Sequence, residues 1–551
     1  MPAPLPEALH TATVLEAAFR YSEAAQLYAD QLPFNPSIPE LHYLLGHALY
    51  KSGTPATACA PLQTALSLKP DFPEAWNCLG LSQRSLGDLD SALASFAQAA
   101  RHPNELEYLC NLADTLLQVG RSAAAIEAYH VVLALDPDNV PALVNLSAAL
   151  LATGGYAEAE QLSRRALALA PQSLNALNNL ANALAEESRP LEAIELYRSS
   201  LTLRPDHPET LCNLGNAYIK LNRLPEALQC FRDAQRLAPD LHEAIFSEGL
   251  VWLRLGNFPE GWWRYEHRLL SKTIVPVPSY PQPFLRTSDD LQGKTLFVHA
   301  DQGLGDDVQF LRFIPALHAR GATILLELPA TLVPLAQASF PYARVFAEAT
   351  PPGPFDFHCL LMSLPYILGL KDESELGPFE YLKVFPLRLA HWRDRLSAQP
   401  GPRIGVVWAG SPKNLMDTRR SISLQQLRTV FDEFQGSVYS LQKEIPPLDS
   451  TDFAQWPSLH TVITPDVDFA ELAAILSSLD LVIAVDTSVA HLAAALGRPT
   501  WLLLAHAPDW RWLQDRTDTA WYPSMRLFRQ PSPGDWPSVL QSVSAVLAKQ
   551  F

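Results

Sequence analysis

The sequence predicts two successive parts, an all-α solenoid followed by two doubly wound α/β halves. Three observations support this prediction. Prolines recur every 34 residues through the first half of the chain. A glycine-rich turn, DQGLGDD at 301–307, follows a strand-like apolar run. Further on, the apolar run Leu481–Val485, a helix-forming stretch and the apolar run Thr500–Leu504 follow one another. Strand–helix–strand order of this kind is typical of a parallel sheet.

The repeating unit of the first half is a pair of helices. The prolines that mark it are Pro36, Pro70, Pro137, Pro171, Pro205 and Pro239, with one double step that spans Pro103. A period of 34 residues is the tetratricopeptide signature. Small and aromatic residues such as Gly80 and Phe96 recur within the units and allow close helix packing. We expect seven units over residues 5–239 and a divergent eighth, at 242–268, that caps the array.

An asparagine column runs along the repeats. Its members, each on the first helix of a successive unit, are Asn111, Asn145, Asn179 and Asn213. The first helices line the concave face of such a superhelix, and an amide offers both a donor and an acceptor. The column can therefore hold the backbone of an extended peptide. The alternative is that these amides only help neighbouring repeats to pack.

Composition excludes several classes of protein. The chain has 551 residues, 48% of them hydrophobic and 18% charged, as in a soluble globular protein. A net charge of −17 argues against a nucleic-acid binder. We find neither a secretory signal nor an apolar run long enough for a membrane span. The six cysteines form no CxxC pair and no metal-ligand spacing, so we expect reduced thiols and a cytoplasmic protein.

The predicted domains are the solenoid at 1–270, a proline-rich linker at 271–291 and two α/β halves at 292–400 and 401–551. In the first half we expect a strand at 294–300, the glycine-rich loop, a helix at 308–319 and a strand at 323–328, with less distinct elements at 355–368. In the second half we expect a strand at 403–409, a polar loop, a helix at 424–434 and a strand at 437–441. The strand–helix–strand unit then follows, and a tail rich in Trp, Arg and Asp spans 509–530.

Polar residues that can cap a helix precede the predicted helix at 489–496. Asp486, Thr487 and Ser488 supply N-cap chemistry, and Gly497 is placed to end the helix. Free backbone N–H groups and the positive end of the helix dipole would then lie at the carboxyl edge of the sheet. Anions, phosphate above all, bind at such helix ends.

Five segments together resemble a known group of proteins. They are DQGLGDDVQFLRFIPAL, WAGSPKNLMDTRRSISL, SLQK, LDLVIAVDTSVAHLAAALGRPTW and DWRWLQDRTDTAWYPSMRLFRQ. The chain resembles the bacterial tetratricopeptide-containing glycosyltransferases, whose GT-B catalytic region is similar to the ADP-heptose heptosyltransferases and whose overall plan is like that of O-GlcNAc transferase. The resemblance implies an acceptor side at 292–400 and a nucleotide-sugar side at 401–551. Asp301 and Asp307 depart from the group, which has Glu and Thr at these places.

The resemblance also implies roles for single residues. Asp306 matches the aspartate thought to act as the catalytic base. The expected donor-binding residues are Lys413, Arg420, Lys443, Asp486, Thr487, Ser488 and His491, with the cations neutralising the departing phosphate. Each has a plainer alternative, since Asp486 can merely cap its helix, His491 can be a core histidine and loop cations are usually just solvated.

No metal and no cofactor are expected. Asp466 and Asp468 precede a helix, so no DxD pair follows a strand where a metal-dependent transferase would carry one.

Two hypotheses follow. The first is an inverting, metal-independent glycosyltransferase that moves a sugar from a nucleotide-sugar to a polypeptide, or another hydroxyl acceptor, presented by the repeats. The second is a protein-interaction scaffold whose GT-B region is inactive.

Overall fold

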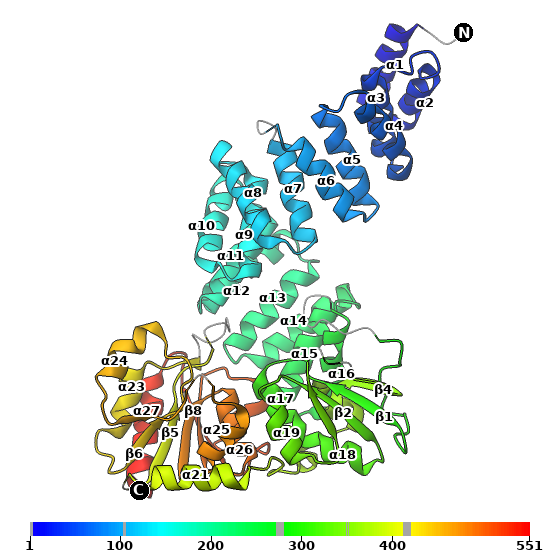
Figure 1. The fold of residues 1–551 in the computed structure, drawn as a ribbon. Coiled ribbons are helices and arrows are strands. Elements are labelled where there is room, and N and C mark those ends of the chain that lie inside the picture. The colour runs from blue at the N-terminus through cyan, green and yellow to red at the C-terminus, as the bar shows by residue number, and fades with distance from the viewer. Residues whose placement is uncertain are drawn as a thin grey trace. The chain divides into compact units, whose positions relative to one another are not determined.

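The computed structural model describes residues 4–102, 106–271, 280–348, 350, 352–399, 401–411, 420–464 and 466–551. The chain divides into two compact units, Met1–Pro205 and Asp206–Phe551 (Figure 1). The first unit holds α1–α12, and the second holds α13–α16 together with both sheets. The predicted domain boundaries remain a prediction, and residues 272–279 of the expected linker lie outside the described part.

Paired helices succeed one another from α1 to α16 (Figure 1), as the 34-residue period predicts. Close packing within a pair depends on small residues. A Cβ on Gly80 would lie 2.7 Å from the ring of Phe96, and one on Gly215 would lie 2.6 Å from the ring of Phe231. The helices are α1 (Leu5–Ala17), α2 (Tyr21–Gln31), α3 (Pro39–Lys51), α4 (Pro55–Leu68), α5 (Pro73–Ser85), α6 (Leu89–Ala99), α7 (Leu106–Gln118), α8 (Ser122–Leu135), α9 (Val140–Thr153), α10 (Tyr156–Leu169), α11 (Leu174–Glu186), α12 (Pro190–Leu203), α13 (Pro208–Lys220), α14 (Leu224–Leu237), α15 (His242–Arg254) and α16 (Phe258–Tyr265).

The eighth pair, α15 and α16, does more than cap the array. Phe258 and Trp262 are 1% and 2% exposed and belong to the same apolar core as residues of both α/β halves. Gly261 allows the approach within the pair, because a Cβ there would lie 2.5 Å from Leu253. The last repeats are therefore built into the second compact unit.

The first sheet has four parallel strands in the order β3-β2-β1-β4. Its strands are β1 (Thr295–His299), β2 (Thr323–Leu328), β3 (Arg344–Ala347) and β4 (Phe357–Leu360). Its helices are α17 (Leu304–Phe310), η2 (Leu311–Phe313), α18 (Ile314–Ala319), α19 (Val333–Ser339), η3 (Leu361–Ser363), α20 (Leu364–Leu368) and α21 (Pro386–Ser397).

The second sheet has six parallel strands in the order β10-β9-β8-β5-β6-β7. This is the doubly wound order, in which the chain winds outward in both directions from its first strand. The strands are β5 (Arg403–Val407), β6 (Ser437–Ser440), β7 (Leu459–Thr461), β8 (Leu481–Val485), β9 (Thr500–Leu504) and β10 (Met525–Arg529). The helices are α23 (Leu424–Arg428), η5 (Thr429–Phe431), α24 (Ser450–Ala454), α25 (Phe469–Leu476), α26 (Ser488–Ala495), η7 (Trp510–Trp512) and α27 (Trp536–Gln550). A repeat array followed by two parallel sheets, consistent with a twin Rossmann-like GT-B region, confirms the predicted fold class.

Two helices differ from expectation. The helix predicted at 308–319 begins earlier, at Leu304, and a 3-10 turn interrupts it. Asp306 explains the early start, since its Oδ2 accepts a hydrogen bond from the N–H of Gly303, the N-cap, at 3.0 Å. The helix predicted at 424–434 ends at Arg428 and continues only as the turn η5.

Candidate functional site

Two predicted donor residues meet where the strand order of the second sheet reverses. The reversal lies between β5 and β8, and ligands of open parallel sheets bind at such points, outside the carboxyl ends of the strands. Asp486 directly follows β8. Arg420, which follows β5 in the chain, donates from Nη1 to the backbone carbonyl of Asp486 at 2.8 Å. The topology thus brings together two residues that are far apart in sequence.

The carboxylate of Asp486 does not cap α26. Thr487 is the N-cap, without a side-chain hydrogen bond, so the expectation of side-chain capping by residues 486–488 is wrong. Oδ2 of Asp486 accepts from Nε1 of Trp512 at 2.7 Å, and Oδ1 lies 3.6 Å from Nε2 of His491. Burial acts to raise the pKa of Asp486, but the contacts with His491 and Trp512 outweigh it and lower the pKa. An ionised carboxylate is thus held at the start of the helix.

His491 lies one turn into α26 and is 5% exposed. Its Nδ1 is 3.0 Å from the hydroxyl of Tyr522, so the ring lies between this hydroxyl and Asp486. The ring is thereby fixed in orientation. A role in holding Asp486 fits this position better than direct exposure to a ligand.

The first turn of α26 is closely approached by α17 of the other half. A Cβ on Gly305 would lie 3.2 Å from Cδ2 of His491 and 3.6 Å from Cα of Ser488. The Oγ1 atom of Thr487 is buried and lacks a hydrogen-bond partner among the described residues. The N-terminus of α26 therefore lies where elements of the two sheets meet.

The two predicted lysines are placed differently. Lys443 is exposed on the segment that follows β6, at the same carboxyl edge of the sheet. Lys413 lies outside the described residues. The structure therefore assigns neither lysine a contact within the site.

Asp306 is accessible and has both carboxylate oxygens engaged. Its side chain is 23% exposed. Oδ2 accepts from the Gly303 N–H, and Oδ1 forms an ion pair with Nη2 of Arg511. A carboxylate oxygen has two lone pairs, so these bonds fix the orientation of Asp306 without using up its capacity to accept.

Asp301 and Asp307 flank this turn, and the side chains of both are buried. Oδ1 of Asp301 accepts from the N–H of Met362 at 3.1 Å, and Oδ2 pairs with Nη2 of Arg268 at 3.2 Å. Asp307 is 0% exposed, and neither of its oxygens has a hydrogen-bond partner in the described part of the chain. Of the three acids, Asp306 alone presents its carboxylate to solvent.

The asparagine column contributes to packing between repeats. In three members the amide nitrogen Nδ2 donates to the preceding repeat. The pairs are Asn111 to Oδ1 of Asn77 at 2.9 Å, Asn145 to Oδ1 of Asp114 at 3.0 Å, and Asn179 to Oγ of Ser147 at 2.7 Å and the carbonyl of Val144 at 2.9 Å. The packing alternative thus accounts for one bond each of Asn111 and Asn145 and two of Asn179, and peptide binding by the column stays a prediction.

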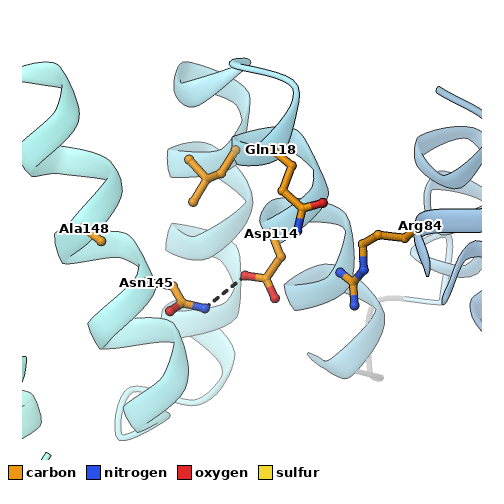
Figure 2. Close-up of a pocket in the computed structure, with 6 residues that line it drawn as sticks. Arg84, Asp114, Gln118, Asn145 and Ala148 are labelled. Carbon is orange, nitrogen blue, oxygen red and sulfur yellow. Dashed lines mark hydrogen bonds between the residues drawn. The ribbon is translucent and has the colours of Figure 1, made fainter. Parts of the chain in front are cut away.

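A pocket of about 460 Å³ opens beside the column in the first compact unit. Figure 2 shows Asn145 bonded to Asp114 within it, with Gln118 and Arg84 beside them. Arg84 also donates from Nη2 to Oδ1 of Asn111 at 3.3 Å. The pocket therefore offers a cation, an anion and amides along one groove.

Sequence reasoning missed Arg511. For its neighbours Trp510 and Trp512 the sequence allows stacking on a sugar or base, but core packing is the commoner fate of aromatic side chains. They are 6% and 1% exposed and pack in the core. The cluster DWRWLQDR is itself a signal, since such a density of Trp and Arg is unusual for a solvated tail. What these residues contact depends on a different sheet and was not readable from the sequence.

The described residues offer neither a metal site nor a membrane-spanning helix. In that part of the chain, three or more His, Cys, Asp or Glu side chains do not gather in a way that could hold a metal ion. None of its helices has the length and apolar character needed to cross a membrane.

Family models match stretches in both parts of the chain. Residues 452–511 match the model of glycosyltransferase family 9 (heptosyltransferase). Residues 43–105 and 110–173 match one tetratricopeptide repeat model, and residues 172–240 match another. The resemblance of the array and of the catalytic region is thereby confirmed.

Individual relatives cover only part of the chain. Protein FlbA of Caulobacter vibrioides (strain ATCC 19089 / CIP 103742 / CB 15) is 28% identical over 316 residues, which are 52% of this chain and 52% of FlbA. The chain thus spans about half the length of this curated relative. A tetratricopeptide repeat protein from Parabacteroides merdae ATCC 43184 is 18% identical with a TM-score of 0.38, over 41% of this chain and 91% of that one. MamA 41-end from Desulfovibrio magneticus RS-1 is 22% identical with a TM-score of 0.29, over 31% and 96%.

Proposed function

We propose that this chain, in which tetratricopeptide repeats precede a glycosyltransferase family 9 region, is an inverting, metal-independent glycosyltransferase. It takes a sugar from a nucleotide-sugar and transfers it to a hydroxyl of a polypeptide held by the repeats. The family match implies the nucleotide-sugar donor, while the polypeptide acceptor and the inversion are our inference.

One observation carries the proposal. Two half-buried acids, Asp306 of the first half and Asp486 of the second half, lie at adjoining helix starts. Gly305 packs against the first turn of α26, and Arg511 and Trp512 contact one acid each. An acceptor-side base and a donor-side anchor at one junction are what a direct displacement on a sugar requires.

In the proposed reaction Asp306 accepts the proton of the acceptor hydroxyl. Its carboxylate takes the proton of the acceptor hydroxyl while that oxygen attacks the anomeric carbon of the sugar. The bond from that carbon to the diphosphate breaks on the opposite face, and the nucleoside diphosphate leaves with the electron pair. A single displacement of this kind inverts the anomeric centre.

The leaving diphosphate is assigned to the start of α26. Backbone N–H groups and the helix dipole stabilise negative charge there, and Arg420, bonded to the carbonyl of Asp486, adds a cation at the same edge. Lys443, on the segment that follows β6, and Lys413, which the sequence alone points to, are proposed to add further positive charge. These groups take the place of a metal ion, since the sequence lacks a DxD pair after a strand.

The acceptor is assigned to the groove of the array. The amide oxygens of Asn145 and Asn179 are not used in the bonds between repeats, and Gln118 is exposed beside Asn145. Such groups bind a peptide backbone without selecting its side chains.

The test uses the purified full-length chain with a panel of nucleotide-sugars. Binding is measured by thermal shift and calorimetry, and turnover by release of the nucleoside diphosphate. Asp306→Asn should lower turnover by about a hundredfold or more with donor affinity little changed. Asp307→Asn is the matched control, because it removes a neighbouring acid that is closed to solvent.

Three results would contradict the proposal. A wild-type chain that binds a donor but never turns it over would indicate the scaffold alternative. Full activity of Asp306→Asn would remove this residue as the base. Loss of activity only in Asp307→Asn would reverse the assignment of the two acids.

A further inference from the structure

The turn η7 joins the two acids of the proposed site. We propose that Arg511 is a positioning residue that holds Asp306 in its reactive orientation and fixes it relative to Asp486. This inference rests on the proposed function and assigns it a residue to which neither sequence nor family gave a role.

Arg511 is 6% exposed, and its guanidinium reaches acceptors on both halves of the catalytic region. Nη2 pairs with Asp306, Nε donates to Oε1 of Gln309 on the same helix, and Nη1 pairs with Asp509 at 2.7 Å. Its Cζ atom also lies 4.4 Å from the ring centre of Trp510. A guanidinium presents such donors in a rigid fork, whereas a lysine ammonium is a single point of charge.

The next residue, Trp512, secures the other acid. Its indole Nε1 donates to Asp486 at 2.7 Å, and its carbonyl accepts from Nη2 of Arg529 at 2.9 Å. Adjacent side chains of one short turn therefore hold the acceptor-side and the donor-side acid. The separation of the two carboxylates is set by this turn as well as by the packing of the two sheets.

The turn is itself rigidly supported. Asp509 caps it by accepting from the N–H of Arg511 at 3.1 Å. Leu513, directly after it, has φ 51° and ψ −155°, a conformation that a non-glycine residue adopts only where its surroundings impose it. Strain of this kind gathers at functional sites, where geometry is held against local preference.

The last repeats support the turn from the other side. The Trp510 and Trp262 ring centres are 5.3 Å apart at right angles, and Nε2 of Gln514 donates to Oδ1 of Asn222 at 2.8 Å. These contacts lie within the second compact unit. A base mounted in this way loses little freedom on reaching the transition state, which is how positioning accelerates a reaction.

The experiment compares Arg511→Gln, Arg511→Lys, Asp306→Asn and the double variant Asp306→Asn/Arg511→Gln in the full-length chain. Arg516→Gln is the matched control, since Arg516 also pairs with two acids, Glu373 at 2.7 Å and Asp518 at 3.0 Å, but does not contact Asp306. Both Arg511 variants should lower kcat tenfold or more and leave donor affinity by calorimetry within threefold. In the Asp306→Asn background, Arg511→Gln should lower the residual turnover no further, because its effect passes through the missing carboxylate.

The results separate this inference from the proposed function. No turnover by the wild-type chain with any donor overturns the function, and this inference with it. A wild-type kcat in Arg511→Lys shows that charge alone suffices and overturns positioning by the fork. If Arg511→Gln lowers turnover by the same factor in the Asp306→Asn background as in the wild type, its effect is a general structural one and the inference is overturned. The same holds if Arg516→Gln lowers kcat as much as Arg511→Gln does. Arg511→Lys keeps the test usable if Arg511→Gln fails to fold.

Discussion

The carboxyl group of Asp307 is buried without the hydrogen bonds that a buried polar group usually makes. It is 0% exposed, and its two oxygens have no hydrogen-bond partner in the described part of the chain. Burial, with a smaller contribution from the charges of Asp306, Asp301 and Glu348, raises its pKa to about 9. At neutral pH the group is therefore protonated in the folded protein and ionised in the unfolded chain.

This environment predicts a pH dependence of stability. Between the ordinary aspartate pKa of 3.8 and the raised pKa of about 9, the folded state binds a proton that the unfolded state has lost. Stability therefore falls as pH rises through this window. Asp307→Asn removes the effect. The difference in melting temperature between the variant and the wild type should therefore be larger at pH 9 than at pH 5, by roughly 3 °C in favour of the variant.

Calorimetry at the two pH values measures this difference. If the wild type and Asp307→Asn lose stability in parallel, Asp307 is ionised in the folded state. The Asp307→Asn variant also serves as the activity control for Asp306.

At the scale of elements, α26 is the structural basis of the donor site. Asp486→Ala removes the acceptor of the Trp512 indole N–H, and His491→Ala removes the ring that lies between Asp486 and Tyr522. Each should weaken nucleotide-sugar binding about tenfold or more while the repeats stay folded. Calorimetry measures the affinity and circular dichroism the helix content. Unchanged affinity in both variants would place the diphosphate elsewhere.

The asparagine column links neighbouring repeats and is proposed to bind the acceptor. Changing Asn145, Asn179 and Asn213 together to Ala should lower transfer to protein acceptors about tenfold or more and spare donor hydrolysis. Two of these amides bond to the preceding repeat, so thermal stability should also fall by about 1 kcal/mol for each bond lost.

A single variant separates packing from binding. Asn213 takes no part in the hydrogen bonds described above for Asn111, Asn145 and Asn179. Asn213→Ala should therefore affect transfer more than stability. Loss of stability without loss of transfer in the triple variant would leave the column a packing feature only.

For the whole molecule, the end of the array belongs with the catalytic region. Phe258 and Trp262 are buried in the core shared with both sheets. A fragment of residues 206–551 should therefore melt cooperatively and keep donor hydrolysis, whereas one of 271–551, cut at the predicted linker, should not fold cooperatively. Calorimetry and donor hydrolysis test both fragments. Equal behaviour would make the eighth pair a dispensable cap.

The sequence determined the elements whose signals are local. The 34-residue period specified the helix pairs, and the buried strands at Leu481–Val485 and Thr500–Leu504 lie where their apolar runs predict. An apolar run or a periodic pattern reflects the burial of a single segment. It can therefore be recognised without knowing which segments pack against it. Short strands such as Arg344–Ala347 and Leu459–Thr461 escaped detection, because their burial comes from the sheet beside them.

The tertiary structure decided what the site residues contact. Sequence motifs pointed to Asp306 and Asp486, but not to the two adjacent side chains of η7 that hold them, Arg511 and Trp512. Arg511 and its partner Asp306 are 205 positions apart in the sequence. Pairing at that distance depends on how two sheets and the last repeats pack, and no local pattern of polarity or spacing encodes it.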